Sequence, residues 1–196
     1  VCSSDLEKSV AGLISVYDML DKCQDEGWKT QKKKEIVELI ESAAGIYTEA
    51  VSSSEYVAQG DSMHVFINTI SQLGIPIQNV SVVTSLLQPF ENHILSHTGK
   101  DSIRLDFKLR KDAPITQPYW LQRPQQSPGL FDLTDSKLVG TPETINTVWI
   151  KMNIAGHDFA FEKPLLYKFN DPVKGETYHP FVITPRILIQ PRSEEH

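Results

Sequence analysis

Three acidic side chains and one pair of histidines are the residues of this chain whose types and spacing could do chemistry. Asp171 and Glu176 lie in one turn-rich stretch with Glu162 shortly before it, and two carboxylates that face a common cleft can act as the acid and base of glycoside hydrolysis. His93 and His97 stand four residues apart, a spacing that places two imidazoles on one face of a helix for zinc. The sequence marks no third metal ligand and no facing acid. We therefore assign no catalytic and no metal-binding residue.

Other kinds of chemistry leave no signature in the sequence. There is no Gly-x-Ser-x-Gly motif for a serine nucleophile and no glycine-rich loop for phosphate. The net charge of −6 and the isoelectric point near 5.5 argue against nucleic acid as a partner, because neutralising its backbone requires a dense basic face. No run of about 20 apolar residues is present to span a membrane.

The acidic stretch from Tyr167 to Phe181 has the pattern of a strand, a shaped loop and an edge strand. The loop begins with Asn-Asp-Pro and contains Gly175, and these residue types favour tight turns. We expect Asp171 and Glu176 to accept hydrogen bonds from backbone donors of the loop. This interpretation makes Asp171, Gly175 and Glu176 structural residues.

The first quarter of the chain has helical periodicity. Apolar residues recur at three- and four-residue spacing over residues 7–24 and again over residues 30–51. Two such helices joined by a short loop pair as an antiparallel hairpin. We therefore predict a helical connector at residues 7–52.

The rest of the chain changes to a period of two, which is typical of strands. Residues 103–110 alternate between apolar and charged, and residues 130–133 and 148–154 also have strand composition, the latter followed by a tight turn at residues 155–158. Short strands with regular turn signals indicate antiparallel sandwiches of immunoglobulin type. The fold class is thus mainly β with an N-terminal helical hairpin (α+β), and the predicted modules are residues 53–126 and 127–191, either separate or continuous.

Three aromatic residues are candidates for contact with a ligand or with a neighbouring module. Tyr119 and Trp120 lie in a segment bracketed by prolines, and Tyr178 follows the acidic loop. One interpretation is that Tyr119 and Trp120 hold neighbouring modules together. The other is that they form, with Tyr178, a platform on which a sugar ring stacks.

The two ends of the chain require a separate interpretation. Residues 1–6 and 192–196 can be encoded by an inverted pair of DNA sequences of the kind found in sequencing adapters. We expect both segments to be artefacts and the chain to be a fragment, so neither end enters the functional argument.

Several motifs resemble one protein family. The strongest are Thr-Gln-Pro-Tyr-Trp-Leu and Asp-Pro-Val-Lys-Gly-Glu, and the resemblance extends over nearly all of residues 7–191. The chain is similar to the C-terminal half of large multidomain proteins of the PIG-L (LmbE-like) deacetylase family. The motifs that carry this resemblance are residues 116–121, 129–131, 140–143, 154–156 and 167–176.

The resemblance implies an upstream Rossmann-like domain that removes an N-acetyl group from an amino sugar, with zinc held by a His-x-Asp-Asp motif and a further histidine. No His-x-Asp-Asp occurs in this chain, so no catalytic or zinc-binding residue is carried over. The fragment would be the accessory region that packs against the catalytic domain in cis or holds glycan near it. The resemblance also implies an extracytoplasmic location. The alternative from a different class is a free-standing immunoglobulin-like adhesion or scaffold module.

Overall fold

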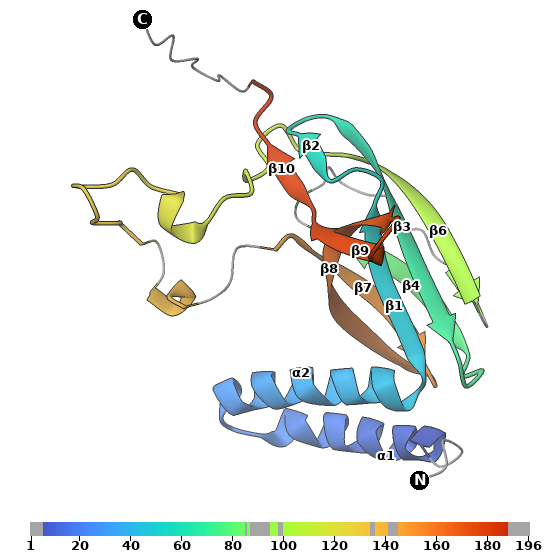
Figure 1. Ribbon diagram of the computed structural model, residues 1–196. Coiled ribbons are helices and arrows are strands. Elements are labelled where there is room, and N and C mark those ends of the chain that lie inside the picture. Colours follow the sequence, from blue (N-terminus) through green and yellow to red (C-terminus); the bar gives the residue numbers. More distant parts are fainter. Residues whose placement is uncertain are drawn as a thin grey trace, which may run out of the picture.

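Two antiparallel helices form the N-terminal end of the molecule (Figure 1). The computed structural model describes residues 6–84, 86, 95–97, 100–133, 136–140 and 145–187. Helix α1 spans Leu6–Met19 and continues as a 3₁₀ turn, η2, at Leu20–Lys22; helix α2 spans Glu26–Ala43. Asp25 caps α2, since its side chain accepts a hydrogen bond from the backbone nitrogen of Trp28 at 2.9 Å. The predicted helical hairpin is therefore confirmed.

The predicted extent of the second helix is wrong. We expected it to continue to residue 51, but α2 ends at Ala43 and strand β1 occupies Ile46–Ser52. Gly45 lies between them with φ of +62°, a left-handed conformation that terminates helices and that glycine adopts without strain. The 3.6-residue pattern of apolar side chains continued into β1 by coincidence, because a strand with one buried face also offers apolar residues at close spacing.

One curled sheet forms most of the remaining structure (Figure 1). Its strand order is β5-β4-β7-β8-β1-β3-β6, with β9 paired to β8, while β2 and β10 form a separate parallel pair. The strands are β2 Tyr56–Ala58, β3 Ser62–Ser71, β4 Ile77–Val83, β5 Leu95–His97, β6 Lys100–Lys108, β7 Thr147–Ile154, β8 His157–Asp171, β9 Gly175–Pro180 and β10 Val182–Thr184, and two further 3₁₀ turns are η3 Tyr119–Leu121 and η4 Ser136–Leu138.

The chain is mainly β, as predicted, but an immunoglobulin-like sandwich is not confirmed. Strands from both sides of residue 126 belong to the same sheet, because β7 lies between β4 and β8 and β1 pairs with β8. The division into modules at residues 53–126 and 127–191 stays a prediction. What the structure establishes is a helical hairpin at one end of a strongly curled sheet (Figure 1).

Two local predictions for the strands are confirmed. In β6, Leu105 and Phe107 are buried while Arg104 and Asp106 are exposed, the alternation of a sheet with one wet face. Strands β7 and β8 join through Ala155-Gly156, both with positive φ, which is the two-residue hairpin turn that matches strand twist.

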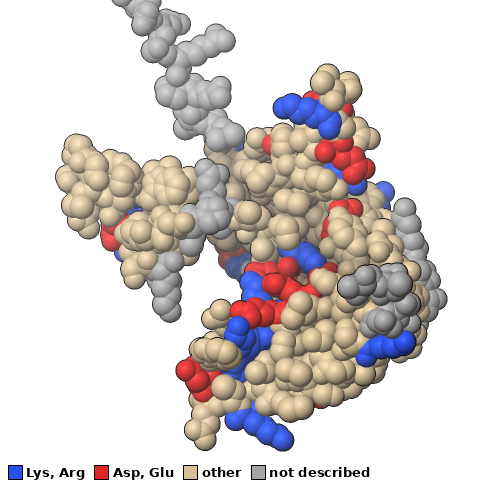
Figure 2. All heavy atoms as spheres, turned by 60° about the horizontal axis from the view of Figure 1, so that its bottom comes forward, with Lys and Arg blue, Asp and Glu red and all other residues tan. Residues whose placement is uncertain are grey.

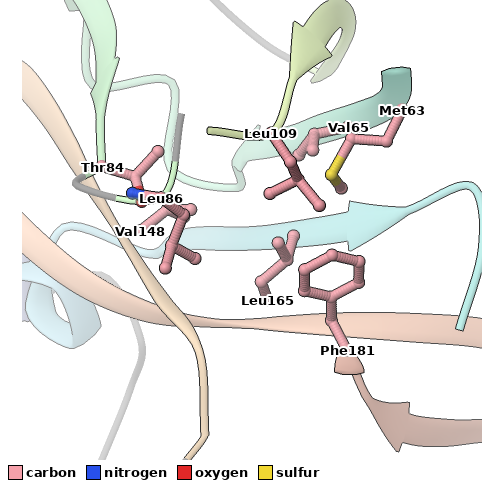
Figure 3. Close-up of a pocket in the computed structure, with 8 residues that line it drawn as sticks. All are labelled: Met63, Val65, Thr84, Leu86, Leu109, Val148, Leu165 and Phe181. Atoms are coloured by element: carbon pink, nitrogen blue, oxygen red, sulfur yellow. Dashed lines mark hydrogen bonds between the residues drawn. The ribbon is translucent and has the colours of Figure 1, made fainter. Parts of the chain in front are cut away.

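The inside of the curled sheet is filled by side chains. A cavity of only about 10 Å³ remains there, roughly the space of one water molecule (Figure 3). Its lining is apolar except for one threonine: Met63, Val65, Thr84, Leu86, Leu109, Val148, Leu165 and Phe181. Among the residues that the structure describes, these side chains leave space there for about one water molecule.

A long excursion, which we call the arm, leaves the sheet between β6 and β7. Among its described residues, 114–133 and 136–140, the regular structure is limited to η3, η4 and a single bridge between Ser127 and Leu130. The strand that we predicted at residues 130–133 is therefore wrong. The arm projects to one side of the sheet (Figure 1).

Candidate binding groove

A groove of about 550 Å³ lies between the helical hairpin and the β7–β8 strands. This volume is in the range of pockets that hold small molecules. Acidic and basic side chains lie side by side along a hollow of the face where the hairpin comes forward (Figure 2). The groove is lined by Tyr17 of α1, by Thr30, Lys33, Lys34, Val37, Glu38 and Glu41 of α2, by Trp149 of β7, and by Ala160, Phe161, Glu162, Lys163 and Pro164 of β8.

Trp149 is the largest aromatic side chain of the groove. Its position alternates with the buried Val148 and Ile150, so the strand turns the indole away from the core, and 43% of the residue remains exposed. Glu162 stands directly opposite Trp149 in the β7–β8 register. The groove thus places a flat apolar ring next to a carboxylate.

A largely buried ion pair fixes the helix to the sheet beside this ring. Lys163 Nζ lies 2.7 Å from Oε1 and 2.8 Å from Oε2 of Glu41, but only Oε2 accepts a hydrogen bond with good geometry, and Oε1 is left without one. Burial raises the pKa of the Glu41 carboxyl, and the nearby Lys163 only partly offsets this. The pair therefore joins α2 to β8, and burial of the Glu41 carboxylate carries a desolvation cost.

Lys33 and Lys34 of the groove also have acidic or aromatic neighbours. Lys34 Nζ is 3.6 Å from Glu162 Oε2, and Lys33 lies 4.4 Å from the centre of the Tyr17 ring. A hydrogen bond to Asp21 raises the pKa of Lys33. With three lysines and three glutamates in its lining, the groove has balanced charge, which suits a neutral or zwitterionic ligand better than a polyanion.

The predicted aromatic pair Tyr119 and Trp120 lies elsewhere, in the arm. The two rings make an edge-to-face contact, with centroids 4.9 Å apart and planes at 88°. The hydroxyl of Tyr119 also accepts a hydrogen bond from the backbone nitrogen of Gly140 at 3.3 Å. The pair thus ties parts of the arm together, and its role in sugar binding stays a prediction.

Tyr178 lies on β9, in a different polar cluster. It is 40% exposed, Lys168 Nζ lies 5.4 Å from its ring centre, and its hydroxyl is 3.4 Å from Glu49 Oε2. Glu49 also accepts a hydrogen bond from the Tyr47 hydroxyl at 2.9 Å, and burial together with Glu49 raises the pKa of Tyr47 to about 12. Tyr178 does not line the groove.

Of the two acidic residues of the loop, Asp171 has a structural role. Asp171 accepts hydrogen bonds from the backbone nitrogens of Val173 and Lys174, each at 2.8 Å, and these bonds lower the pKa of Asp171. Gly175 has φ of +80°. Glu176 instead lies 3.1 Å from Lys168 Nζ on the strand surface, so the backbone contact that we expected for Glu176 is replaced by an ion pair.

The rejected catalytic candidates are not brought together. Glu162 and Asn170, the register partner of Glu176, are eight residues apart on β8, which is roughly 26 Å of strand. His93 lies outside the described residues, and residue 97 belongs to β5. Within the described ranges, no group of three or more His, Cys, Asp or Glu residues is arranged to hold a metal ion, and no helix is long and apolar enough to cross a membrane.

Sequence reasoning did not identify the groove. The one available signal was Trp149, a large aromatic at the solvent-facing position of an alternating strand. Glu41 and Lys163 carried no signal of their own, because they are 122 residues apart in the chain and their pairing depends on how the hairpin packs against the sheet.

Comparisons with known proteins give no family for this chain. No family model matches it, and no curated protein matches it. The structure of the Pseudomonas fluorescens alkylpurine DNA glycosylase AlkC, bound to DNA containing an abasic site analog, is 10% identical, with a TM-score of 0.29 over 83% of this chain and 45% of that one. The sporulation control protein Spo0M of Bacillus subtilis is 13% identical, with a TM-score of 0.29 over 62% of this chain and 48% of that one. The chain thus spans about half the length of both, and similarities this weak indicate neither its fold nor its function.

Proposed function

We propose that this chain is a non-catalytic, saccharide-binding accessory module of a sugar N-deacetylase-like protein, and that the groove between the helical hairpin and the β7–β8 strands holds the saccharide. The observation that carries the proposal is the exposed Trp149 in a groove of about 550 Å³. An exposed indole beside hydrogen-bonding side chains suits a sugar ring, which has apolar C–H faces and a polar rim.

The charges of the groove support the same class of ligand. Carboxylates accept hydrogen bonds from hydroxyl groups, and ammonium groups donate hydrogen bonds to them. Lys34, Glu38 and Glu162 line the groove and are exposed, so they can contact a ligand there. Because acids and bases balance, a nucleic acid or another polyanion gains little from this site. A neutral sugar or an amino sugar meets both donors and acceptors.

Catalysis is assigned to a different part of the parent protein in this proposal. The resemblance to PIG-L deacetylases supplies the expectation of an upstream zinc domain and of an exported location. The described residues offer no group of three or more His, Cys, Asp or Glu side chains that fits zinc. The contribution of this chain would be to hold glycan near the catalytic domain.

Isothermal titration calorimetry with glucosamine and N-acetylglucosamine oligomers tests the proposal. We expect binding heat with the unchanged chain and its loss in Trp149→Ala. Trp28→Ala is the matched control, because Trp28 is an exposed tryptophan on α2 that does not line the groove. Absence of heat with the unchanged chain, or equal heat in both variants, would contradict the groove as the saccharide site.

A further inference from the structure

The three lysines and three glutamates that line the groove do not pair one to one. Lys163 lies 2.7 Å from Glu41, and this contact joins β8 to α2. Lys34 lies 3.6 Å from Glu162. These two contacts use two of the lysines and two of the glutamates, so the local charge of the groove depends on the remaining residue of each kind.

The remaining lysine, Lys33, forms its ion pair with a residue outside the groove. Its ammonium group donates a hydrogen bond to Asp21 of η2, and Asp21 is not part of the groove lining. The remaining glutamate, Glu38, is exposed, and within the described ranges its carboxylate has no hydrogen bond and no ion pair. The groove therefore carries one uncompensated negative charge, although its lining is neutral by composition.

Glu38 lies on the same face of α2 as Glu41, which follows it by three residues. Burial is the main reason that the pKa of Glu41 is raised; Lys163 lowers it, and the negative charge of Glu38 raises it further. The two carboxylates thus repel each other across the groove wall. A positively charged group bound in the groove would reduce this repulsion.

Trp149 is a second feature of the groove that attracts a cation. The residue is 43% exposed, and the face of an indole ring attracts an ammonium group. An ammonium group has three hydrogen-bond donors and no acceptor, so it suits a carboxylate as well as the indole face. An acetamido group is neutral and gains neither charge-dependent interaction.

Resting on the proposed saccharide site, we propose that Glu38 makes the groove selective for amino sugars that carry a free ammonium group over sugars whose nitrogen is acetylated. The Glu38 carboxylate forms an ion pair with the ammonium group, and Trp149 packs against the sugar ring. Because Glu38 is exposed to solvent, the preference should be moderate, about threefold to fivefold in the dissociation constant.

Isothermal titration calorimetry of the full chain with three oligomers of equal length tests this inference: glucosamine, N-acetylglucosamine and glucose. We expect the glucosamine oligomer to bind about threefold to fivefold more tightly than the other two. The glucose oligomer has neither the charge nor the acetyl group. It therefore separates recognition of the ammonium group from steric exclusion of the acetyl group.

Glu38→Gln should bring the three dissociation constants to about the same value, because the charge that distinguishes the oligomers is then no longer recognised. Its unfolding midpoint should stay unchanged, since Glu38 is exposed. Asp61→Asn is the matched control. It removes one negative charge from an exposed residue between β2 and β3 that does not line the groove, and it should retain the preference for the glucosamine oligomer.

Three results would overturn the inference and leave the saccharide site standing. They are equal binding of the glucosamine and N-acetylglucosamine oligomers by the unchanged chain, a glucose oligomer that binds as tightly as the glucosamine oligomer, and a preference that Glu38→Gln retains or that Asp61→Asn loses equally. Absence of binding for all three oligomers would contradict the proposed saccharide site itself, and this inference with it.

Discussion

Lys163 of β8 and Glu41 of α2 form an ion pair at 2.7 Å that joins the helical hairpin to the sheet across 122 residues of sequence. Their side chains are 21% and 12% exposed, respectively. Both residues line the groove. The position of α2 relative to Trp149, and hence the shape of the groove, depends on this contact.

Replacing Lys163 alone should lower the free energy of unfolding more than replacing Lys163 and Glu41 together. In Lys163→Met the Glu41 carboxylate loses its counter-charge, and we expect the free energy of unfolding at neutral pH to fall by about 1–3 kcal/mol, less than for a fully buried pair. The double variant Glu41→Gln/Lys163→Met should recover part of that loss. Urea unfolding followed by circular dichroism measures both values, and equal stability of Lys163→Met and the unchanged chain would contradict the role of the pair.

Glu41 should also make stability depend on pH. Its folded-state pKa is raised above the usual 4.5 by burial, although Lys163 acts in the opposite direction and Glu38 adds to the increase. As the pH rises above 4.5, the unfolded chain releases this proton before the folded chain does, so the Glu41 contribution to stability falls until the pH passes the folded-state pKa.

Glu41→Gln removes this titration. Relative to that variant, the unchanged chain should lose stability as the pH increases from the usual pKa of 4.5 through the higher folded-state pKa. Urea unfolding of both proteins at a series of pH values gives the difference directly. A difference that is constant with pH, or that changes in the other direction, would show that Glu41 is not destabilised by burial.

Gly45 should be required for the change from helix to strand. An added Cβ would combine positive φ with an approach of 2.7 Å to Leu73 Cγ, so Gly45→Ala should destabilise the fold by about 1–3 kcal/mol. Gly12→Ala is the control, because a Cβ at this helical position meets nothing within 4 Å and should stabilise the chain by about 0.5–1 kcal/mol. Thermal unfolding that ranks the two variants in the opposite order would contradict this account.

The helix-to-strand change shows where local sequence information ends. The helical hairpin and the Ala155-Gly156 turn could be predicted, because periodicity and turn chemistry are properties of neighbouring residues. β1 could not, because Tyr47, Ala50 and Val51 fit a helical stripe equally well. Its strand conformation depends on pairing with β3 and with β8, and β8 lies more than 100 residues later in the sequence.

The groove could be predicted from local sequence patterns even less than β1 could. Trp149 could be identified as an outward-facing aromatic from the alternation of its strand. The acidic and basic residues around it come from α2 and β8, and no spacing rule connects those segments. Composition likewise could not separate the predicted aromatic candidates on the arm and on β9 from the tryptophan that lines the groove.

Asp171 and Glu176, the two acidic residues at the β8–β9 turn, should differ in their contribution to thermal stability. Asp171→Ala removes two backbone hydrogen bonds and should lower the melting temperature by a few degrees. Because the folded-state pKa of Asp171 is lowered, this contribution is present above its usual pKa of 3.8 and is lost as the pH falls through the folded-state value. Glu176→Ala, the control, loses an exposed ion pair and should change the melting temperature little. A larger effect of Glu176→Ala would reverse these assignments.

The fluorescence of Trp149 tests the central claim most directly. The chain has three tryptophans, so the double variant Trp28→Phe/Trp120→Phe leaves Trp149 as the single reporter in the groove. On titration with glucosamine or N-acetylglucosamine oligomers, we predict a saturable change in its emission, and no such change in Trp149→Phe, where Trp28 and Trp120 report instead. Unchanged Trp149 emission at saturating oligomer, or a saturable change seen in Trp149→Phe alone, would contradict saccharide binding in the groove.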